Sequence, residues 1–472
     1  MQGWKKGSIT VFLALMLGLL VSLLAASIES VRMAAARAQI LCGMDAGLFS
    51  LFGQYDRELF DRYDLLALAG SADGSDPGLA ALYHCFMDYM EPVLSENSQM
   101  LSASFGGFSG YELMTDDGGS PFLSQVRDWA EKTSGEEPSL PDSEACSKAG
   151  RWLRKGRRRR NKNWYASYQA VLVEALAAGE AAAEGELTSG EAGFLYAGNG
   201  GDPLGVVYRY AQLDLRAQVF SKGMHLSKER ITAPLADRSL RTGMPMPAPR
   251  RRTASRRELT AYLSAHLGDY RSPALSGLSC QLEYVLCQKG ADLPNMEETI
   301  RTLYLLRLGA NEESMKKDAY AGRAVSAVAE NISRGYLVPP DQDRLSEAIM
   351  DAWIYVESIL DVRQLLLGGC IPEQKGGRWQ AVPSALGDAL KKEQDIRGSG
   401  RDYRWYLQLL LLRMPVKKLA EGGMSIIEHA VRSSGRSGFC LDACVTAAEL
   451  SADVTANRRK TFEVTRSRRY DP

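Results

Sequence analysis

The sequence predicts a mainly α protein. It begins with an N-terminal transmembrane helix that continues into an amphipathic stalk, followed by a largely helical extracytoplasmic region with minor β structure. Residues 9–28 are apolar and uncharged, no proline occurs before Pro77, and apolar residues recur at helical spacing over most of the chain after residue 257. The 472 residues are 45% hydrophobic and 24% charged, which is ordinary for globular domains with their own cores.

The apolar run from Ile9 to Ile28 is long enough to cross a membrane. Its twenty residues would form a helix of roughly 30 Å, which is the thickness of a bilayer's hydrocarbon core. Lys5 and Lys6 precede it and form a short basic leader. The alternative is a cleaved secretory signal, with small residues at Ala25–Ser27 for a peptidase. We favour a retained anchor because the run is longer than the apolar part of such signals.

Four small residues lie at intervals of four within this span: Ala14, Gly18, Ser22 and Ala26. On a helix they form one stripe, along which a second helix backbone can approach closely. The stripe is therefore predicted to be a helix-packing surface. Small residues are also common in membrane helices without such a role, so this alternative stays open.

The helical pattern continues after the span. Apolar residues recur at helical spacing at Ile40, Met44, Leu48 and Leu51, which predicts an amphipathic stalk. Three glycines, Gly43, Gly47 and Gly53, predict a kink or break near its far end. Further helices are expected over residues 79–90 and 122–132, with Gly- and Ser-rich turns between them.

The segment 133–163 is predicted to be a linker. It contains prolines, glycine and acidic residues, followed by a basic run from Arg154 to Arg160. That run is the sharpest local charge feature of the chain. A solvated linker is the favoured interpretation, contact with anionic lipid headgroups is the second, and nucleic acid is the third.

The remainder of the chain is predicted to be mostly helical, with short strands over residues 206–210 and 461–465. Helices are expected over 257–267, 278–288, 296–308, 314–333, 343–367, 403–412, 425–431 and 441–450. The expected organisation is a basic leader (1–8), a transmembrane helix (9–28), a stalk and membrane-proximal helical module (29–132), a linker (133–163) and a mostly helical C-terminal domain (164–472).

No catalytic, cofactor-binding or metal-ligating residue is predicted, and no cofactor. The histidines, His84, His225, His266 and His429, lack the spacing of a zinc site on a helix. Eight cysteines are too sparse for a disulfide framework and are expected to be small buried residues. The phosphate-cradling pattern G-x-x-x-x-G-K-[ST] is absent.

Carboxylates share one predicted helix at Asp351, Glu357 and Asp361. Glu357 and Asp361 are one turn apart, which is compatible with an acid/base pair or with a charged, solvated helix face. The second interpretation is the commoner one for such spacing.

Charge restricts the expected partners. The 57 basic and 57 acidic residues give zero net charge, so nothing at the level of the whole chain favours nucleic acid. Basic residues stand on both sides of the span, and local charge leaves the orientation open. The short N-terminal tail favours an amino terminus in the cytoplasm and a body outside the cell membrane.

The start of the chain, KKGSITVFLALMLGLLVSLLAASIESVRMAAARAQI, and later segments such as IMDAWIYVESILDVRQLLLGGC and RDYRWYLQLLLLRMP resemble a bacterial family of unknown function with one N-terminal membrane helix, which accompanies tight-adherence (Tad) pilus genes. The N-terminus is also similar to that of the TadE and TadG pseudopilins. This resemblance implies leader cleavage between Gly7 and Ser8. However, Val11, Phe12 and Leu13 occupy the region where those leaders carry a glutamate.

The sequence and this resemblance together lead us to expect a membrane-anchored, exported structural or assembly component of a Tad-like pilus or secretion system. Its expected partners are the lipid bilayer and other membrane helices or pilus and secretion components, with an oligomer left open and no nucleic acid. The alternative is a membrane-tethered extracytoplasmic domain that binds or hydrolyses an unknown substrate.

Overall fold

The chain forms two compact units. Unit 1 contains residues 1–132, 239–254 and 431–472, and unit 2 contains residues 133–238 and 255–430. The computed structural model describes residues 5–71, 73–95, 101–133, 140–182, 203–220, 224, 226–247, 251–392, 396, 398–456 and 460–470. Unit 2 thus consists of two inserted segments, since the chain leaves unit 1 after residue 132, returns to it at residues 239–254 and returns again at residue 431.

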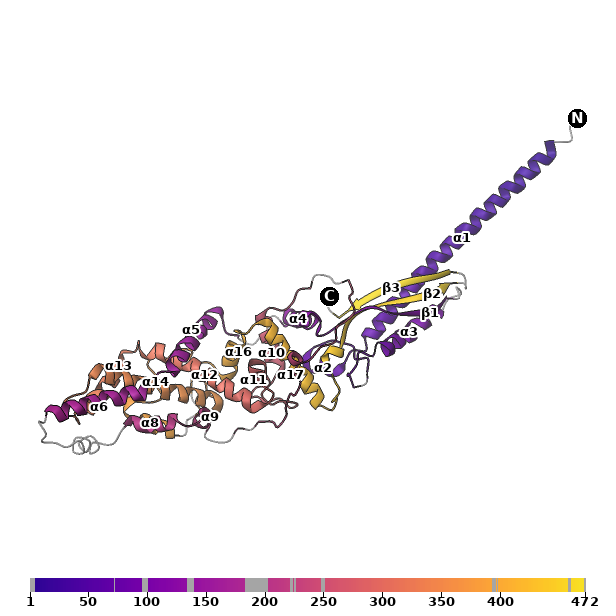
Figure 1. Cartoon of the computed structure of the whole chain (residues 1–472). Helices are drawn as coiled ribbons and strands as arrows, with labels where there is room; N and C mark the ends of the chain where they lie inside the picture. The colour runs from indigo at the N-terminus through magenta and orange to yellow at the C-terminus, as the bar shows by residue number, and fades with distance from the viewer. Residues whose placement is uncertain are drawn as a thin grey trace. The chain divides into compact units, whose positions relative to one another are not determined.

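Unit 1 combines helices with a small antiparallel sheet (Figure 1). Its helices are α1 (Lys5–Phe52), α2 (Arg57–Tyr63), α3 (Leu79–Ser95) and α4 (Asp116–Lys132). Its strands are β1 (Leu101–Leu113), β2 (Val445–Ala456) and β3 (Lys460–Arg469), in the spatial order β1-β2-β3.

The sheet joins the two ends of the chain. β2 and β3 form a hairpin, and β1 pairs with β2 in a register that sets Leu101 opposite Ala456. β1 contains glycines that let the strands approach closely: a Cβ on Gly106 would lie 2.1 Å from the Ser451 carbonyl oxygen. Only glycine fits at such a position.

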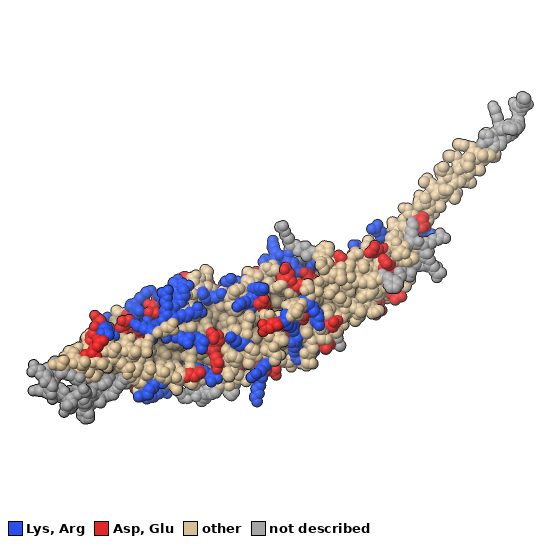
Figure 2. All heavy atoms as spheres, viewed as in Figure 1, with Lys and Arg blue, Asp and Glu red and all other residues tan. Residues whose placement is uncertain are grey.

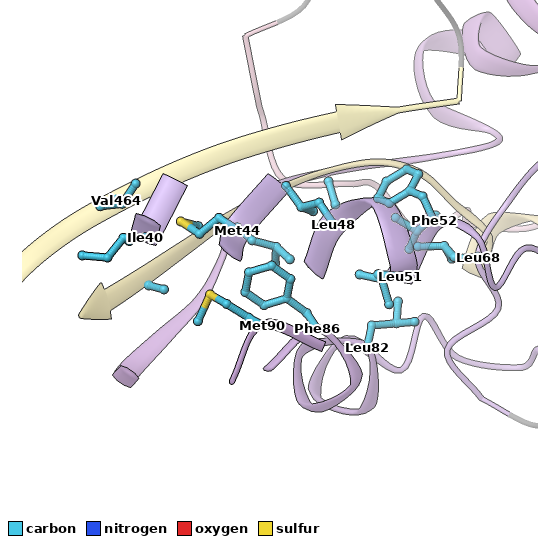
Figure 3. Packing of buried hydrophobic residues seen from close by; sticks show 14 of the residues in the cluster. Ile40, Met44, Leu48, Leu51, Phe52, Leu68, Leu82, Phe86, Met90 and Val464 are labelled. Carbon is cyan, nitrogen blue, oxygen red and sulfur yellow. The ribbon is translucent and has the colours of Figure 1, made fainter. Parts of the chain in front are cut away.

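The core of unit 1 lies between α1, α3 and the sheet (Figure 3). Ile40, Met44 and Leu51 of α1 are fully buried, as are Phe86 and Met90 of α3. Each such side chain contributes about 1.5–3 kcal/mol by leaving water. The C-terminal part of α1 is therefore held by a continuous apolar cluster.

Unit 2 is built of helices. They are α5 (Ser143–Arg160), α6 (Trp164–Ala182), α8 (Pro203–Ala211), α9 (Leu215–Val219), α10 (Arg256–His266), α11 (Gln281–Cys287), α12 (Asp292–Met315), α13 (Ala319–Ser333), α14 (Gln342–Leu367), α15 (Leu386–Lys391), α16 (Tyr403–Leu411) and α17 (Val416–Ser433), the last of which ends in unit 1. Residues throughout α12 and α14 are buried, so these two long helices form the centre of the unit.

Helices α5 and α12 pack at very short range. A Cβ on Gly156 would lie 2.0 Å from the Leu305 carbonyl oxygen, and a Cβ on Gly309 would lie 2.0 Å from that of Trp152. One glycine from each helix thus brings the two backbones together. Trp152 is 1% exposed and packs beside this contact.

The structure confirms the mainly α class, the continuation of the apolar helix into an amphipathic stalk and the strand at 461–465. Helix α1 passes through Gly43 and Gly47 without a break and ends just before Gly53. The helices predicted between residues 257 and 431 are present, with shifted ends.

Three local predictions are wrong. Residues 206–210 are helical in α8 and not a strand, because Val207 is buried and Val206 packs toward Gly387 of α15. Residues 445–450 belong to β2 and not to a helix, because they pair with β1 and β3. The Gly-rich segment expected to be a turn is β1.

The segment predicted to be a linker contains α5. Asp142 caps this helix by accepting a hydrogen bond from the Ala145 amide at 2.7 Å. Small and apolar residues, among them Ala149 and Leu153, recur at helical spacing between the basic residues and are buried. The basic run thus forms the end of a packed helix. Residues 134–139 lie outside the described part of the chain.

The eight cysteines are free thiols. Only Cys280 and Cys444 are buried, Cys42 is exposed, and the other five are half-buried. The expectation of small buried residues therefore holds for two of them.

Candidate functional site

Helix α1 divides into two parts with opposite surroundings. In residues 9–31, which we call the exposed half, the large apolar side chains are 46% to 69% exposed. In residues 36–52, which we call the covered half, one face is buried, beginning with Ala36 and Ile40. The exposed half extends beyond the sheet and α3 of its own unit (Figure 1).

The exposed half has the composition of a membrane span. Its 18-residue window of highest mean hydropathy reaches 2.6, and none of that window is buried. The sequence has no charged residue between Ile9 and Ile28, and Figure 2 shows no blue or red side chain on the visible face of this part of the helix until it nears the folded unit. Among the described residues, α1 is the one helix that is long and apolar enough to cross a membrane.

All four residues of the predicted packing stripe lie on the exposed half, and Ala14, Gly18, Ser22 and Ala26 are each exposed. A Cβ on Gly18 would meet no atom within 4 Å. The described part of the chain thus leaves this stripe uncovered, and its role in packing stays a prediction.

The predicted processing residues lie at the start of the same helix. Gly7 and Ser8 belong to the first turns of α1. Their side chains lie outside the described part of the structure, and so do residues 1–4. Cleavage between them stays a prediction.

Glu357 and Asp361 belong to a buried ionic network in unit 2. Both are fully buried, so the expectation of a solvated charged face is wrong for them. Arg307 Nε donates to Asp361 Oδ2 at 2.9 Å, and Lys375 Nζ lies 2.5 Å from Asp361 Oδ1 and also pairs with Glu357. Two cations and two carboxylates thus balance each other away from water.

Neutral groups complete this network. The backbone N–H groups of Gln380 and Ala381 donate to the two oxygens of Glu357 at 2.7 and 3.1 Å. Asn311 Nδ2 donates to Asp361 Oδ2 at 2.9 Å. Every oxygen of both carboxylates therefore has a donor. The network links α12 and α14 to the chain around residues 375–381, which is an architectural role.

The pKa values of the two carboxyls move in opposite directions. Burial raises the pKa of Glu357 more than Lys375 lowers it. Burial also acts to raise the pKa of Asp361, but Lys375 and Arg307 together outweigh it and lower that pKa. Asp361 is thus the firmly ionised member of the pair.

Sequence reasoning missed the partners of these carboxylates. Arg307 precedes Asp361 by 54 residues and Lys375 follows Glu357 by 18, outside the helix, so only the fold brings the four groups together. A local signal for burial did exist, because Glu357 and Asp361 stand in WIYVESILDV, where apolar residues occur on every side of the helix.

The described histidines do not gather. His84 lies on α3, His266 on α10 and His429 on α17, whereas His225 lies outside the described residues.

Asp351, the third carboxylate of the α14 set, is 4% exposed and pairs with Arg159 and Lys162.

The fold and the exposed apolar helix define a mainly α protein with one candidate membrane span at its N-terminus. The chain belongs to a family described as a family of unknown function (DUF5702), whose model matches residues 197–456, more than half of the chain. The match ends at the last residue of β2 and excludes α1 and β1. No curated protein and no solved structure matches the chain.

Proposed function

We propose that this protein is a membrane-anchored, exported structural or assembly component, pseudopilin-like, of a Tad-like pilus or secretion system. The observation that carries the proposal is the exposed half of α1, which the described part of the chain leaves uncovered. A helix of this length and composition is stable when lipid or other apolar helices surround it. Its proposed partners are therefore the bilayer and neighbouring helices.

Two further features support an assembly role. The covered half is packed against α3 and the sheet, so the anchor and the folded unit share one continuous helix. A mechanical force on the anchor is therefore transmitted to the folded unit. The stripe of Ala14, Gly18, Ser22 and Ala26 offers a surface for close backbone contact. The resemblance of the N-terminus to TadE and TadG supports the part of the proposal that names a Tad-like pilus or secretion system.

The decisive experiment replaces residues 9–28 by an unrelated apolar helix of equal length. We expect the variant to remain in the membrane fraction, because any apolar span anchors, and to lose its chemically cross-linked assemblies. If assembly survives unchanged, the span is only a tether, and a tethered binding or hydrolytic domain becomes the better proposal. Full-length wild-type protein recovered free in the cytosol would contradict the anchor itself.

A matched pair of point variants tests the stripe. Gly18→Ile adds a branched side chain where the chain itself has open space, so it leaves the fold of the monomer unchanged and is expected to abolish cross-linking. Ser27→Ile, about half a helical turn around from Gly18, makes a comparable change on the opposite side and is expected to retain cross-linking. Equal effects of the two variants would contradict a specific stripe.

The proposed orientation places the amino terminus in the cytoplasm and the body outside. Cys42 is the exposed cysteine and follows the span. A membrane-impermeant maleimide is expected to label it in intact cells, and Cys42→Ser is expected to remove that labelling. Labelling of Cys42 only after lysis would reverse the orientation. Mass spectrometry of the mature amino terminus tests cleavage between Gly7 and Ser8.

A further inference from the structure

Helix α5 carries two kinds of basic residue. Lys148, Lys155 and Arg159 each lie 2.7 Å from a glutamate oxygen. Five other arginines are exposed and form no ion pair with a described residue: Arg151, Arg154, Arg157, Arg158 and Arg160. Figure 2 shows blue side chains gathered in the region of α5. This concentration of unpaired positive charge attracts anions.

The end of this helix meets two adjoining hollows in the surface of unit 2, of about 370 and 350 Å³. Arg160 and Arg301 line both of them. Arg301, from α12, is exposed, and its nearest carboxylate oxygen, on Glu298, is 3.6 Å from its Nη1. Two guanidinium groups from different helices thus stand at the border between the hollows. Arg160 forms no ion pair with a described residue, and Arg301 forms an exposed one, with Glu298, that a bound anion can replace.

The larger hollow has an aromatic wall. Trp164, Tyr304 and Tyr355 line it, with ring centroids 6.1 Å apart for Trp164 and Tyr355 and 6.3 Å apart for Tyr304 and Tyr355. Its volume is within the range of small-molecule sites, roughly 300–1,000 Å³. Such a wall favours an apolar or aromatic group on the bound molecule.

The carboxylate in this hollow already has two cationic partners. Asp351 pairs with Arg159, and its Oδ2 lies 2.9 Å from Lys162 Nζ. Arg159 and Lys162 also pair with Glu312 and Glu347, and Arg301 pairs with Glu298, so the unpaired positive charge of this wall is that of Arg160. The Tyr304 hydroxyl is a donor in the same wall: burial raises its pKa by more than Arg160 and Arg159 lower it, so it keeps its proton at neutral pH.

We propose that the larger hollow binds an organic phosphate, with the phosphate group held by Arg160, Arg301 and the Tyr304 hydroxyl and the organic group against Trp164 and Tyr355. Guanidinium groups match phosphate oxygens in bidentate geometry, and two of them balance a dianion. The phosphate comes from a free phosphate ester or from a lipid headgroup. This site does not depend on the assembly role of α1.

The test measures binding by calorimetry to the full-length protein in an uncharged detergent. The probes are phenyl phosphate, benzoate, inorganic phosphate and monomeric dihexanoyl phosphatidic acid. We expect phenyl phosphate to bind at least about tenfold more tightly than inorganic phosphate or benzoate, because only it supplies both the dianion and the ring. Phosphatidic acid binding more tightly than phenyl phosphate identifies a lipid headgroup as the source, and weaker binding identifies a free ester.

Matched variants locate the site. Arg160→Gln and Arg301→Gln are expected to weaken phenyl phosphate binding about tenfold each, and Tyr304→Phe severalfold. Arg151→Gln removes the same charge from the same helix but lines neither hollow, and it is expected to change binding less than about twofold. All three substituted arginines are exposed, and circular dichroism checks that the variants stay folded.

Three results would overturn the proposal. Equal weakening by Arg151→Gln and Arg160→Gln would show a diffuse basic surface in place of a site. Equal affinity for benzoate and phenyl phosphate would remove the preference for phosphate. Absence of phenyl phosphate binding to the folded wild-type protein would remove the site altogether.

Discussion

The two halves of α1 are parts of one continuous helix and have opposite surroundings. In the covered half, Met44 and Leu51 are fully buried against α3 and the sheet, whereas in the exposed half Leu15 and Leu17 are 69% and 64% exposed. Apolar residues at helical spacing therefore predict a helix, but not what covers it. In one half the chain itself provides the cover, and in the other the described residues provide none.

The largest difference between the halves is expected from removing an aromatic ring. Phe86→Ala takes a fully buried side chain from between α3 and the covered half and should lower the free energy of unfolding of unit 1 by about 3–5 kcal/mol. Phe12→Ala, in the exposed half, should leave it unchanged. Hydrogen exchange of the β2 amides measures both effects, and equal protection in the two variants would contradict the division.

A smaller difference is expected from enlarging a glycine in each half. A Cβ on Gly47 would lie 3.0 Å from the Phe86 ring and 3.2 Å from the Phe86 carbonyl oxygen, whereas one on Gly18 would meet nothing. Gly47→Val should therefore destabilise unit 1 by about 1–3 kcal/mol through overpacking, and Gly18→Val should not. The same exchange experiment measures this. No loss of β2 protection in Gly47→Val would show that α1 and α3 separate at little cost.

The smallest effect at neutral pH concerns titration in unit 1, which contains the covered half. Burial raises the pKa of Tyr63, in α2 of that unit, to about 12, whereas the exposed half has no charged residue between Ile9 and Ile28. The folded state holds this proton more tightly than the unfolded state does, so its contribution is complete below pH 10. It is lost as the pH rises from 10 to 12, by about 1.4 kcal/mol per pH unit.

Unfolding of unit 1 as a function of pH checks this, with Tyr63→Phe as the control that lacks the titrating hydroxyl. Wild type should lose stability more steeply than the variant above pH 10. Identical slopes would show that Tyr63 titrates as freely in the folded state as in the unfolded one.

Much of the architecture could be predicted from local pattern. The apolar run, the stalk and the helices after residue 257 all follow from spacing and from where proline and glycine fall. β1 could not be recognised, because its glycines read as turns, and they suit a strand only once Ser451 lies beside Gly106. Residues 445–450 form a strand because β1 and β3 flank them, which is a tertiary effect.

The candidate sites divide in the same way. The stripe on α1 could be predicted because residues four apart on a helix always share a face. Arg160 and Arg301 could not be paired from sequence, since 140 positions separate them and only the packing of α5 on α12, through Gly156 and Gly309, brings them to one border. The basic run appeared to be a linker because its buried residues are mostly small and stand between arginines.

By itself, the sequence determined that one uncharged helix stands at the amino end and that helices dominate the rest, because hydrophobicity and periodicity are properties of neighbouring residues. Only the tertiary structure decided which face of α1 is covered, which carboxylates are buried with Arg307 and Lys375, and which arginines stay unpaired. Those outcomes depend on contacts between distant segments, and burial and pairing are properties of such contacts.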